Sequence, residues 1–133
     1  MSDSIDQAVI EFPLYVANKA IKSGQWLEVH DKFSGKIYAK VALADAKILE
    51  KSISAAVKAE KEMAALKPFQ KQKILLHCVQ RFKELREELT QILIIEGGKP
   101  KLAAAAEVER LINTFQLARS EEHTSELQSP VRS

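Results

Sequence analysis

The chain has 133 residues, of which 46% are hydrophobic and 29% are charged, and its formal net charge is +2. A chain of this length can form at most one hydrophobic core. Its apolar content is too high for a disordered chain. Because the Lys and Arg residues are interleaved with Glu, the charge pattern indicates neither a nucleic-acid surface nor an anionic-membrane surface.

Cysteine content and the N-terminus bear on where the protein resides. The single cysteine, Cys78, excludes an internal disulfide and a multi-thiolate metal site, and fits a reducing compartment. The first residues, MSDSIDQAVIEF, are acidic where a signal peptide would be basic, and no apolar run is long enough to span a bilayer. We therefore expect a cytoplasmic protein with no membrane partner.

Short strands and turns are predicted first, after an N-terminal tail over residues 1–11. The strands are Leu14–Val16, Trp26–Val29 and Lys36–Val41, the last of which alternates polar and apolar residues as a half-buried strand does. Ser23-Gly24 is a turn signal, and the polar run from His30 ends at Gly35, which suits a positive φ.

The apolar period changes from two to 3.6 at Asp45, a good N-cap residue for a first helix that ends at Lys67-Pro68. A second helix is predicted from about Phe69 to Gly97-Gly98, and Pro100 is suited to open a third. The apolar stripe of the first helix is Leu49, Ile53, Ala56, Val57 and Met63. That of the second is Leu75, Cys78, Val79, Phe82, Leu85, Leu89, Ile92 and Leu93. That of the third is Ala104, Val108, Leu111, Ile112 and Phe115. The predicted fold class is α/β, with short β-strands followed by three amphipathic helices.

Gly97-Gly98-Lys99-Pro100 is one candidate site. A phosphate-binding Walker A loop follows a strand and has a hydroxyl residue after its lysine, whereas this pair follows a helix and has proline there. A helix C-cap and turn is the favoured interpretation, with phosphate binding as the alternative. No G-x-G-x-x-G fingerprint occurs in the chain.

Histidine and cysteine side chains give no complete catalytic or metal site. His77 and Cys78 are adjacent and diverge on a helix, and Cys78 lies on the apolar stripe, so a structural thiol is favoured over a nucleophile. His30 and His123 lack partners at metal-ligand spacing and are expected to be surface residues. Three lysines near the second helix (Lys67, Lys71 and Lys73) are expected to be solvated, and Trp26 is expected in the core or at its rim.

In chain order, several blocks resemble the N-terminal segment of the NAD(P)-dependent aldehyde dehydrogenase superfamily over residues 12–118. The most specific block is Glu96–Pro100 followed by Glu107-Val108, at the family's spacing. The arginine that leads the family's "e-R-x-x-i-L" motif is absent here. The other matching blocks are Leu14–Asn18, Gln25-Trp26, Val29–Lys36, Asp45 with Ala55–Ala59, and Gln70–Leu75.

The resemblance implies that residues 12–118 are the N-terminal part of an NAD(P)-binding domain in a larger, oligomeric enzyme that uses NAD or NADP. It implies oxidation of an aldehyde to an acid through a cysteine thiohemiacetal, and is strongest to the branch that oxidises glyceraldehyde 3-phosphate, lactaldehyde and similar small aldehydes. The family's nucleophile, base and cofactor residues correspond to positions beyond Ala118. Only Arg110 is carried over, as a substrate-binding residue, with an ordinary surface arginine as the alternative.

The last residues, 119–133, have a different character. RSEEHTSELQS, from Arg119 to Ser129, is identical to the codon-by-codon translation of a common short-read sequencing adapter. We interpret residues 119–133 as an artefactual tail, expected to be disordered; residues 130–133 have no assigned origin.

Two expectations follow for the 133-residue chain: it lacks dehydrogenase activity, and its apolar helix stripes stay partly uncovered. The alternative is a stand-alone helical module whose stripes dock on a partner protein.

Overall fold

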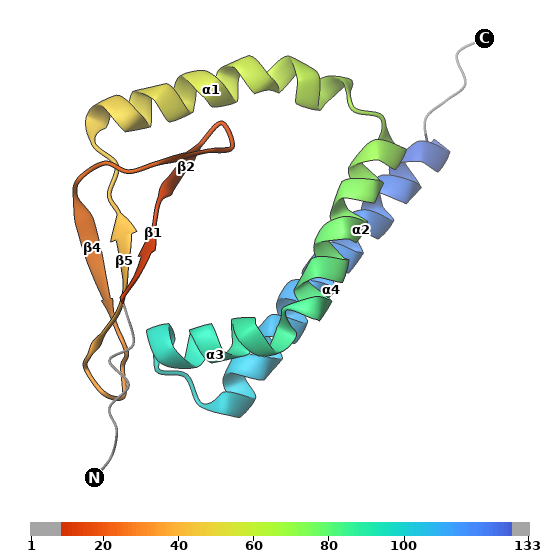
Figure 1. The fold of residues 1–133 in the computed structure, drawn as a ribbon. Coiled ribbons are helices and arrows are strands. Elements are labelled where there is room, and N and C mark those ends of the chain that lie inside the picture. The colour runs from red at the N-terminus through yellow and green to blue at the C-terminus, as the bar shows by residue number, and fades with distance from the viewer. Residues whose placement is uncertain (1–8, 129–133) are drawn as a thin grey trace. The chain divides into compact units, whose positions relative to one another are not determined.

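The computed structural model describes residues 9–128 of the chain. They form two compact units that meet in the sequence between Glu60 and Lys61. The first unit holds the strands and the second holds helices α2, α3 and α4, as labelled in Figure 1. The predicted order of short strands followed by helices is therefore confirmed.

Five strands make two small sheets in the first unit. The larger sheet has the order β1-β5-β4, with β1 parallel and β4 antiparallel to β5, and β2 pairs with β3 as an antiparallel hairpin. The strands are β1 (Ile10–Phe12), β2 (Leu14–Val16), β3 (Lys19–Ile21), β4 (Trp26–His30) and β5 (Ile37–Ala42).

Three strands were predicted within one residue at each end, and two were missed. β1 occupies part of the expected tail: Ile10 and Glu11 pair with β5, so the boundary at residue 11 was wrong, while residues 1–8 lie outside the described residues. β3 was missed because Ala17 and Asn18 were not read as a turn. Both have positive φ, of 48° and 62°, which is the two-residue turn that joins tight hairpins.

A single side chain organises the turn between β4 and β5. The Asp31 carboxylate accepts hydrogen bonds from the Phe33 amide and the Ser34 hydroxyl, both at 2.8 Å. The Gly35 amide donates to the Asp31 carbonyl at 2.8 Å, and Gly35 has the predicted positive φ, 72°. These bonds set the register in which His30 faces Ile37.

Helix α1 (Ala46–Ala65) begins as predicted. The Ile48 amide donates to Asp45 Oδ1 at 2.8 Å, which is the expected N-cap bond. No residue of α1 is buried. Its predicted apolar stripe is exposed throughout, and the half-buried positions lie on a neighbouring face, at Ile48, Ser52 and Ala55.

The second predicted helix is divided in two, so the structure has four helices rather than three. α2 (Pro68–Glu84) and α3 (Arg86–Gly97) are separated at Leu85, where α3 leaves the axis of α2 (Figure 1). The Leu85 amide still donates to Arg81 and its carbonyl still accepts from Leu89, so the apolar period continues across the break. Neither proline nor glycine marks Leu85, which is why the sequence pattern did not reveal it.

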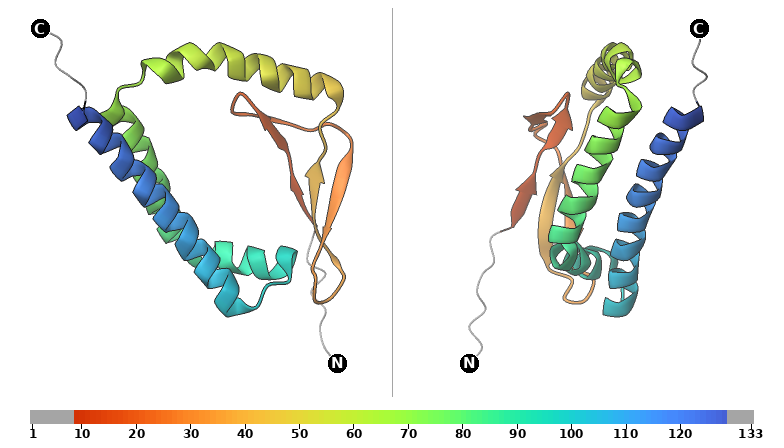
Figure 2. Two further views of the ribbon diagram at one scale, coloured as in Figure 1. Left: turned by 180° about the vertical axis from the view of Figure 1, so that it is seen from behind. Right: turned by 90° about the vertical axis from the view of Figure 1, so that its right-hand side faces the viewer.

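Helix α4 (Lys101–Gln128) runs antiparallel to α2 and packs along it, as Figure 2 shows. The core of this unit is a cluster of three buried residues, Val79, Val108 and Ile112. The partly buried residues that pack against it are Phe82, Leu89, Leu93 and Phe115. The second and third predicted stripes therefore supply this core.

The described part of the expected disordered tail is helical. α4 continues past Arg119 to Gln128, whereas residues 129–133 lie outside the described residues. Extending an existing helix is far easier than nucleating one, and residues 119–128 contain neither proline nor glycine. The expectation of disorder was therefore wrong for residues 119–128, and their proposed adapter origin is a separate matter.

Candidate functional site

The turn between α3 and α4 is built by glycine. Gly98 has φ 63° and ψ 24°, the left-handed conformation that ends many helices, and its amide donates to the Ile94 carbonyl at 3.0 Å. Pro100 follows, and its carbonyl accepts the first hydrogen bond of α4, from Ala104. The backbone geometry is therefore that of the favoured C-cap and turn.

Lys99 points from this turn toward α4. Its ammonium group binds the carboxylate of Glu107, eight residues ahead, and both side chains are about two-fifths exposed. The hydrogen bond from Lys99 is the main cause of a lowered pKa at Glu107. Desolvation opposes it, and the charges of Lys99 and Arg110 lower the pKa further. Glu107 is therefore held as a carboxylate.

Arg110, the one residue expected to bind substrate, lies on α4 one turn beyond Glu107 and is exposed. Among the residues that the structure describes, no carboxylate forms an ion pair with it. The neighbouring Glu109 is instead bound by Arg86 of α3. Lys99 and Arg86 thus bind the two glutamates that precede Arg110 on α4, Glu107 and Glu109, while the Arg110 side chain is exposed.

Sequence reasoning missed both of these ion pairs. Lys99 and Glu107 are separated by a helix start, and Arg86 and Glu109 lie on different helices. The rule that pairs residues three or four apart on one helix detects neither. The signal in the sequence for the first pair is the co-occurrence of Glu96–Pro100 with Glu107-Val108, which does not by itself specify a contact.

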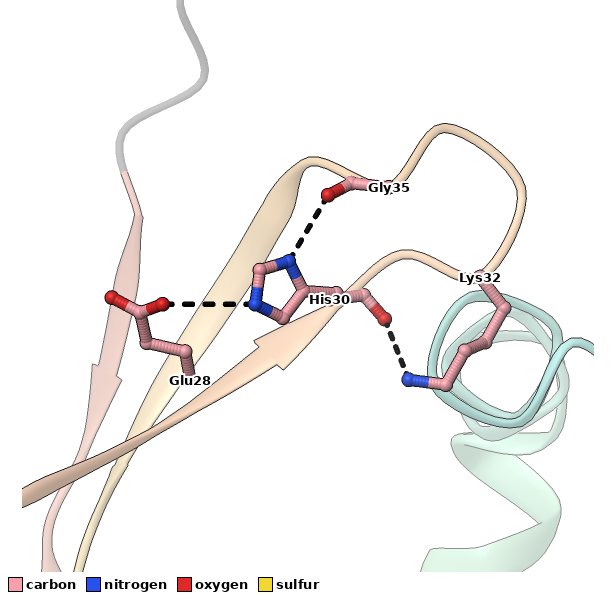
Figure 3. Close-up of polar contacts among 4 residues, drawn as sticks. All are labelled: Glu28, His30, Lys32 and Gly35. Atoms are coloured by element: carbon pink, nitrogen blue, oxygen red, sulfur yellow. Dashed lines mark hydrogen bonds and ion pairs between the residues drawn. The ribbon is translucent and has the colours of Figure 1, made fainter.

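The His30 side chain belongs to the β4–β5 turn (Figure 3). Its Nδ1 lies 3.0 Å from the Gly35 carbonyl oxygen, and its Nε2 lies 3.6 Å from Glu28 Oε2. Because a carbonyl oxygen can only accept, Nδ1 is the donor in this hydrogen bond. Lys32 Nζ donates to the His30 carbonyl at 3.1 Å. His30 is exposed, as expected, and its contacts link β4 to the turn that follows it.

The other candidate residues of the sequence analysis lie far from Arg110 in the sequence. Among the described side chains, they do not come together in a site. Cys78 is half-buried on α2 and His77 beside it is exposed, while His123 lies outside the residues whose side chains are described. Lys73 Nζ lies 6.0 Å from the centre of the Phe69 ring. Among the residues whose side chains the structure describes, no three His, Cys, Asp or Glu gather in a way that could hold a metal ion.

A depression of about 220 Å³ lies along α2 and α4. Arg110 is not among its lining residues, which are Leu76, Val79, Lys83, Gln116, Arg119 and Ser120. The Arg119 Nε atom is buried without a hydrogen-bond partner among the described residues. Within that same part of the chain, no helix is both long enough and apolar enough to cross a membrane.

The family model for the aldehyde dehydrogenase family matches residues 19–131. The chain belongs to the aldehyde dehydrogenase family. The matched range starts later than residue 12 and extends beyond Ala118, where the resemblance was expected to end.

Individual aldehyde dehydrogenases show the same relationship. The chain is 33% identical over 100 residues to a lactaldehyde dehydrogenase from Methanocaldococcus jannaschii, covering 71% of this chain and 22% of that protein. Aldehyde dehydrogenase 21 from Physcomitrella patens, solved in complex with the reaction product succinate, superposes with a TM-score of 0.82 at 35% identity, covering 85% of this chain and 24% of that one.

A third relative is a 3,6-anhydro-L-galactose dehydrogenase solved in complex with NAP. Its TM-score is 0.78 at 26% identity, and the match covers 83% of this chain and 24% of that one. The chain thus spans 22–24% of the length of these three relatives.

Proposed function

We propose that this chain is the N-terminal part of an NAD(P)-dependent aldehyde dehydrogenase that oxidises a small aldehyde to a carboxylic acid. The observation that carries the proposal is the family match over residues 19–131, together with a span of only 22% of a curated relative. The reaction would run through a cysteine thiohemiacetal in a cytoplasmic homo-oligomer, as the family resemblance implies.

We propose no nicotinamide-dinucleotide site within this chain. The chain has no G-x-G-x-x-G sequence, and its glycine turn between α3 and α4 follows a helix rather than a strand. Cys78 does not correspond to the family's nucleophile. No step of the reaction is therefore assigned to a residue of this chain, and the 133-residue chain is expected to be inactive.

Substrate binding is the one role proposed within the chain. Arg110 is exposed and has no ion-pair partner among the described residues, which supports a role in binding an anionic group of the aldehyde. The relative with succinate as reaction product suggests a carboxylate-bearing aldehyde, whereas the lactaldehyde dehydrogenase suggests a neutral one. The glyceraldehyde-3-phosphate branch remains part of this proposal, because a phosphate would suit the same guanidinium.

The test starts at the source gene. Its coding region, amplified again and sequenced through codon 118, is expected to continue in frame into a long α/β sequence, with the codons for residues 119–133 replaced. The recovered protein is expected to form NADH or NADPH with a panel of small aldehydes, as followed by absorbance. The 133-residue chain, assayed in parallel, is expected to form none.

Each outcome has a distinct meaning. A natural stop at codon 133 would overturn the adapter interpretation and favour the helical interaction module. Cofactor reduction by the 133-residue chain would overturn its proposed inactivity. A recovered full-length protein that oxidises no aldehyde would overturn the enzyme proposal itself.

A further inference from the structure

Glu107 lies between two cations, and this arrangement raises a question of pairing. Glu107 and Arg110 are three residues apart on α4, the spacing at which a carboxylate and a guanidinium commonly pair on an exposed helix face. In the structure the Glu107 carboxylate is bound by Lys99 instead. Arg110 acts on Glu107 only through its charge, as the lesser of the two cationic influences on that carboxyl group.

We propose that Lys99 is a specificity-determining positioning residue: by binding Glu107, it leaves the Arg110 guanidinium available for the anionic group of an aldehyde substrate. This inference rests on the proposed function. The substrate class is an aldehyde that carries a carboxylate or a phosphate. Lys99 then contributes to substrate selection, whereas Gly98 and Pro100 determine the conformation of the turn.

The charges of the group explain why Lys99 matters. Lys99, Glu107 and Arg110 together carry one net positive charge, which attracts an anion. Without Lys99 the group would be neutral, and Arg110 would be the nearest cation for Glu107 at a favourable helical spacing. An anionic substrate would then compete with Glu107 for the guanidinium, whereas the binding of a neutral aldehyde does not depend on that charge.

The geometry also explains why the turn can perform this task. Gly98 turns the chain at the end of α3, and Pro100 starts α4 directly after Lys99. Lys99 is therefore fixed at the base of α4, and its long side chain runs along the helix to Glu107. Exposed ion pairs contribute little to folding stability, so the removal of this one is expected to leave the fold intact.

The experiment uses the full-length enzyme recovered from the source gene and a matched pair of four-carbon aldehydes, succinic semialdehyde and butanal. The readout is the ratio of KM for the anionic aldehyde to KM for the neutral one. Loss of a charge-assisted contact in Arg110→Met is expected to raise this ratio about 10-fold to 100-fold. Lys99→Met leaves the guanidinium in place but lets it pair with Glu107, and is expected to raise the ratio about 2-fold to 5-fold, the equivalent of one exposed ion pair.

A rescue variant and a control separate positioning from structure. The double variant Lys99→Met with Glu107→Gln removes the competing carboxylate, so the KM ratio is expected to return to that of the unmodified enzyme. Arg86→Met removes the other ion pair to α4, with Glu109, and is expected to leave the ratio unchanged.

Equal changes of KM for both aldehydes in Lys99→Met, or a double variant that is not rescued, would overturn the inference while leaving the enzyme proposal intact. An unmodified enzyme that oxidises neither these two aldehydes nor any other would overturn both. If Arg110→Met leaves the KM ratio unchanged, the substrate role of Arg110 and this inference fall together.

Discussion

The rings of Phe82 on α2 and Phe115 on α4 meet edge to face, with their centres 4.9 Å apart and their planes at 80°. This geometry places the positive edge of one ring against the negative face of the other, and such pairs stabilise beyond the area that they bury. The pair lies beside the buried cluster of Val79, Val108 and Ile112. The antiparallel α2–α4 pair is therefore the best-packed part of the second unit.

Shortening Ile112, which is 2% exposed, to alanine is expected to weaken the α2–α4 pair. The lost burial and the cavity left behind are expected to lower the free energy of opening of α4 by about 2–4 kcal/mol. Amide hydrogen exchange in α4 measures this energy directly. Leu117→Ala, at a position that is 67% exposed, is the control and is expected to change it by less than about 0.5 kcal/mol. Equal effects of the two changes would contradict this account of the core.

Adjacent glycines in the α3–α4 turn are expected to respond differently to alanine. Gly98 has a positive φ, so Gly98→Ala is expected to cost about 1–2 kcal/mol. Gly97 is helical, and an added Cβ would meet Lys99 Cγ at an ordinary 3.6 Å, so Gly97→Ala is expected to be neutral or stabilising by up to about 1 kcal/mol. Exchange of the amides at the end of α3 in the two variants tests the difference. The left-handed cap would be disproved by a Gly98→Ala variant as stable as Gly97→Ala.

Acid is expected to open the β4–β5 turn. Hydrogen bonds from the Phe33 amide and the Ser34 hydroxyl hold the pKa of the Asp31 carboxyl below its usual range. The Ser34 amide and the charge of Lys32 add to this effect, and desolvation opposes it. A lowered pKa in the folded state means that the stabilisation is present at neutral pH and is lost as the pH falls through that lowered value. Protection of the Phe33 and Gly35 amides is therefore expected to disappear only at strongly acidic pH.

Two substitutions check the role of Asp31. Asp31→Ala is expected to remove this protection at neutral pH, because it removes both side-chain acceptors. Asp31→Asn keeps one oxygen acceptor but cannot titrate, so its turn is expected to show the same protection across the acidic range. A pH dependence that persists in Asp31→Asn would assign the transition to another group.

The exposed stripe of α1 is expected to make the 133-residue chain associate. Leu49, Ile53 and Val57 are 56%, 50% and 63% exposed and lie on one side of the helix, and contiguous apolar surface of this kind favours association. Size-exclusion chromatography is expected to give a mass above 14.9 kDa and dye binding is expected to report exposed apolar surface. Leu49→Lys, Ile53→Glu and Val57→Lys together are expected to reduce both. A sharp cooperative melt of the unmodified chain as a monomer would contradict this prediction.

Local rules were sufficient for much of the fold. The N-cap at Asp45, the positive φ at Gly35 and the glycine end at Gly98 each depend on one or two neighbouring residues, and all three are confirmed. Periodicity located the stripe that buries Val108 and Ile112, because α2 is present to cover it. The same rule located the stripe on α1, and the exposure of that stripe agrees with the expectation that the helix stripes stay partly uncovered.

Non-local features escaped prediction. β1 exists because Ile10–Phe12 meets β5 from a distant part of the chain, and its own sequence is too short to indicate a strand. The break at Leu85 has no local marker. At the candidate site, Arg110 was proposed from the resemblance and stays a prediction. The binding of Glu107 by Lys99 depends on how the α3–α4 turn directs one flexible side chain, which no sequence spacing specifies.

The topology of the larger sheet also sets an order of assembly. β4 and β5 are joined by the short Asp31–Gly35 turn, so their pairing closes a small loop, whereas β1 must close a much longer one to reach the far edge of β5. All three residues of β1 are exposed, so little burial offsets that entropy. We expect β1 to be the last strand to join during folding and the first to detach. Detachment would free an edge of β5 to which the same strand of another molecule could add, which is the starting point for strand exchange.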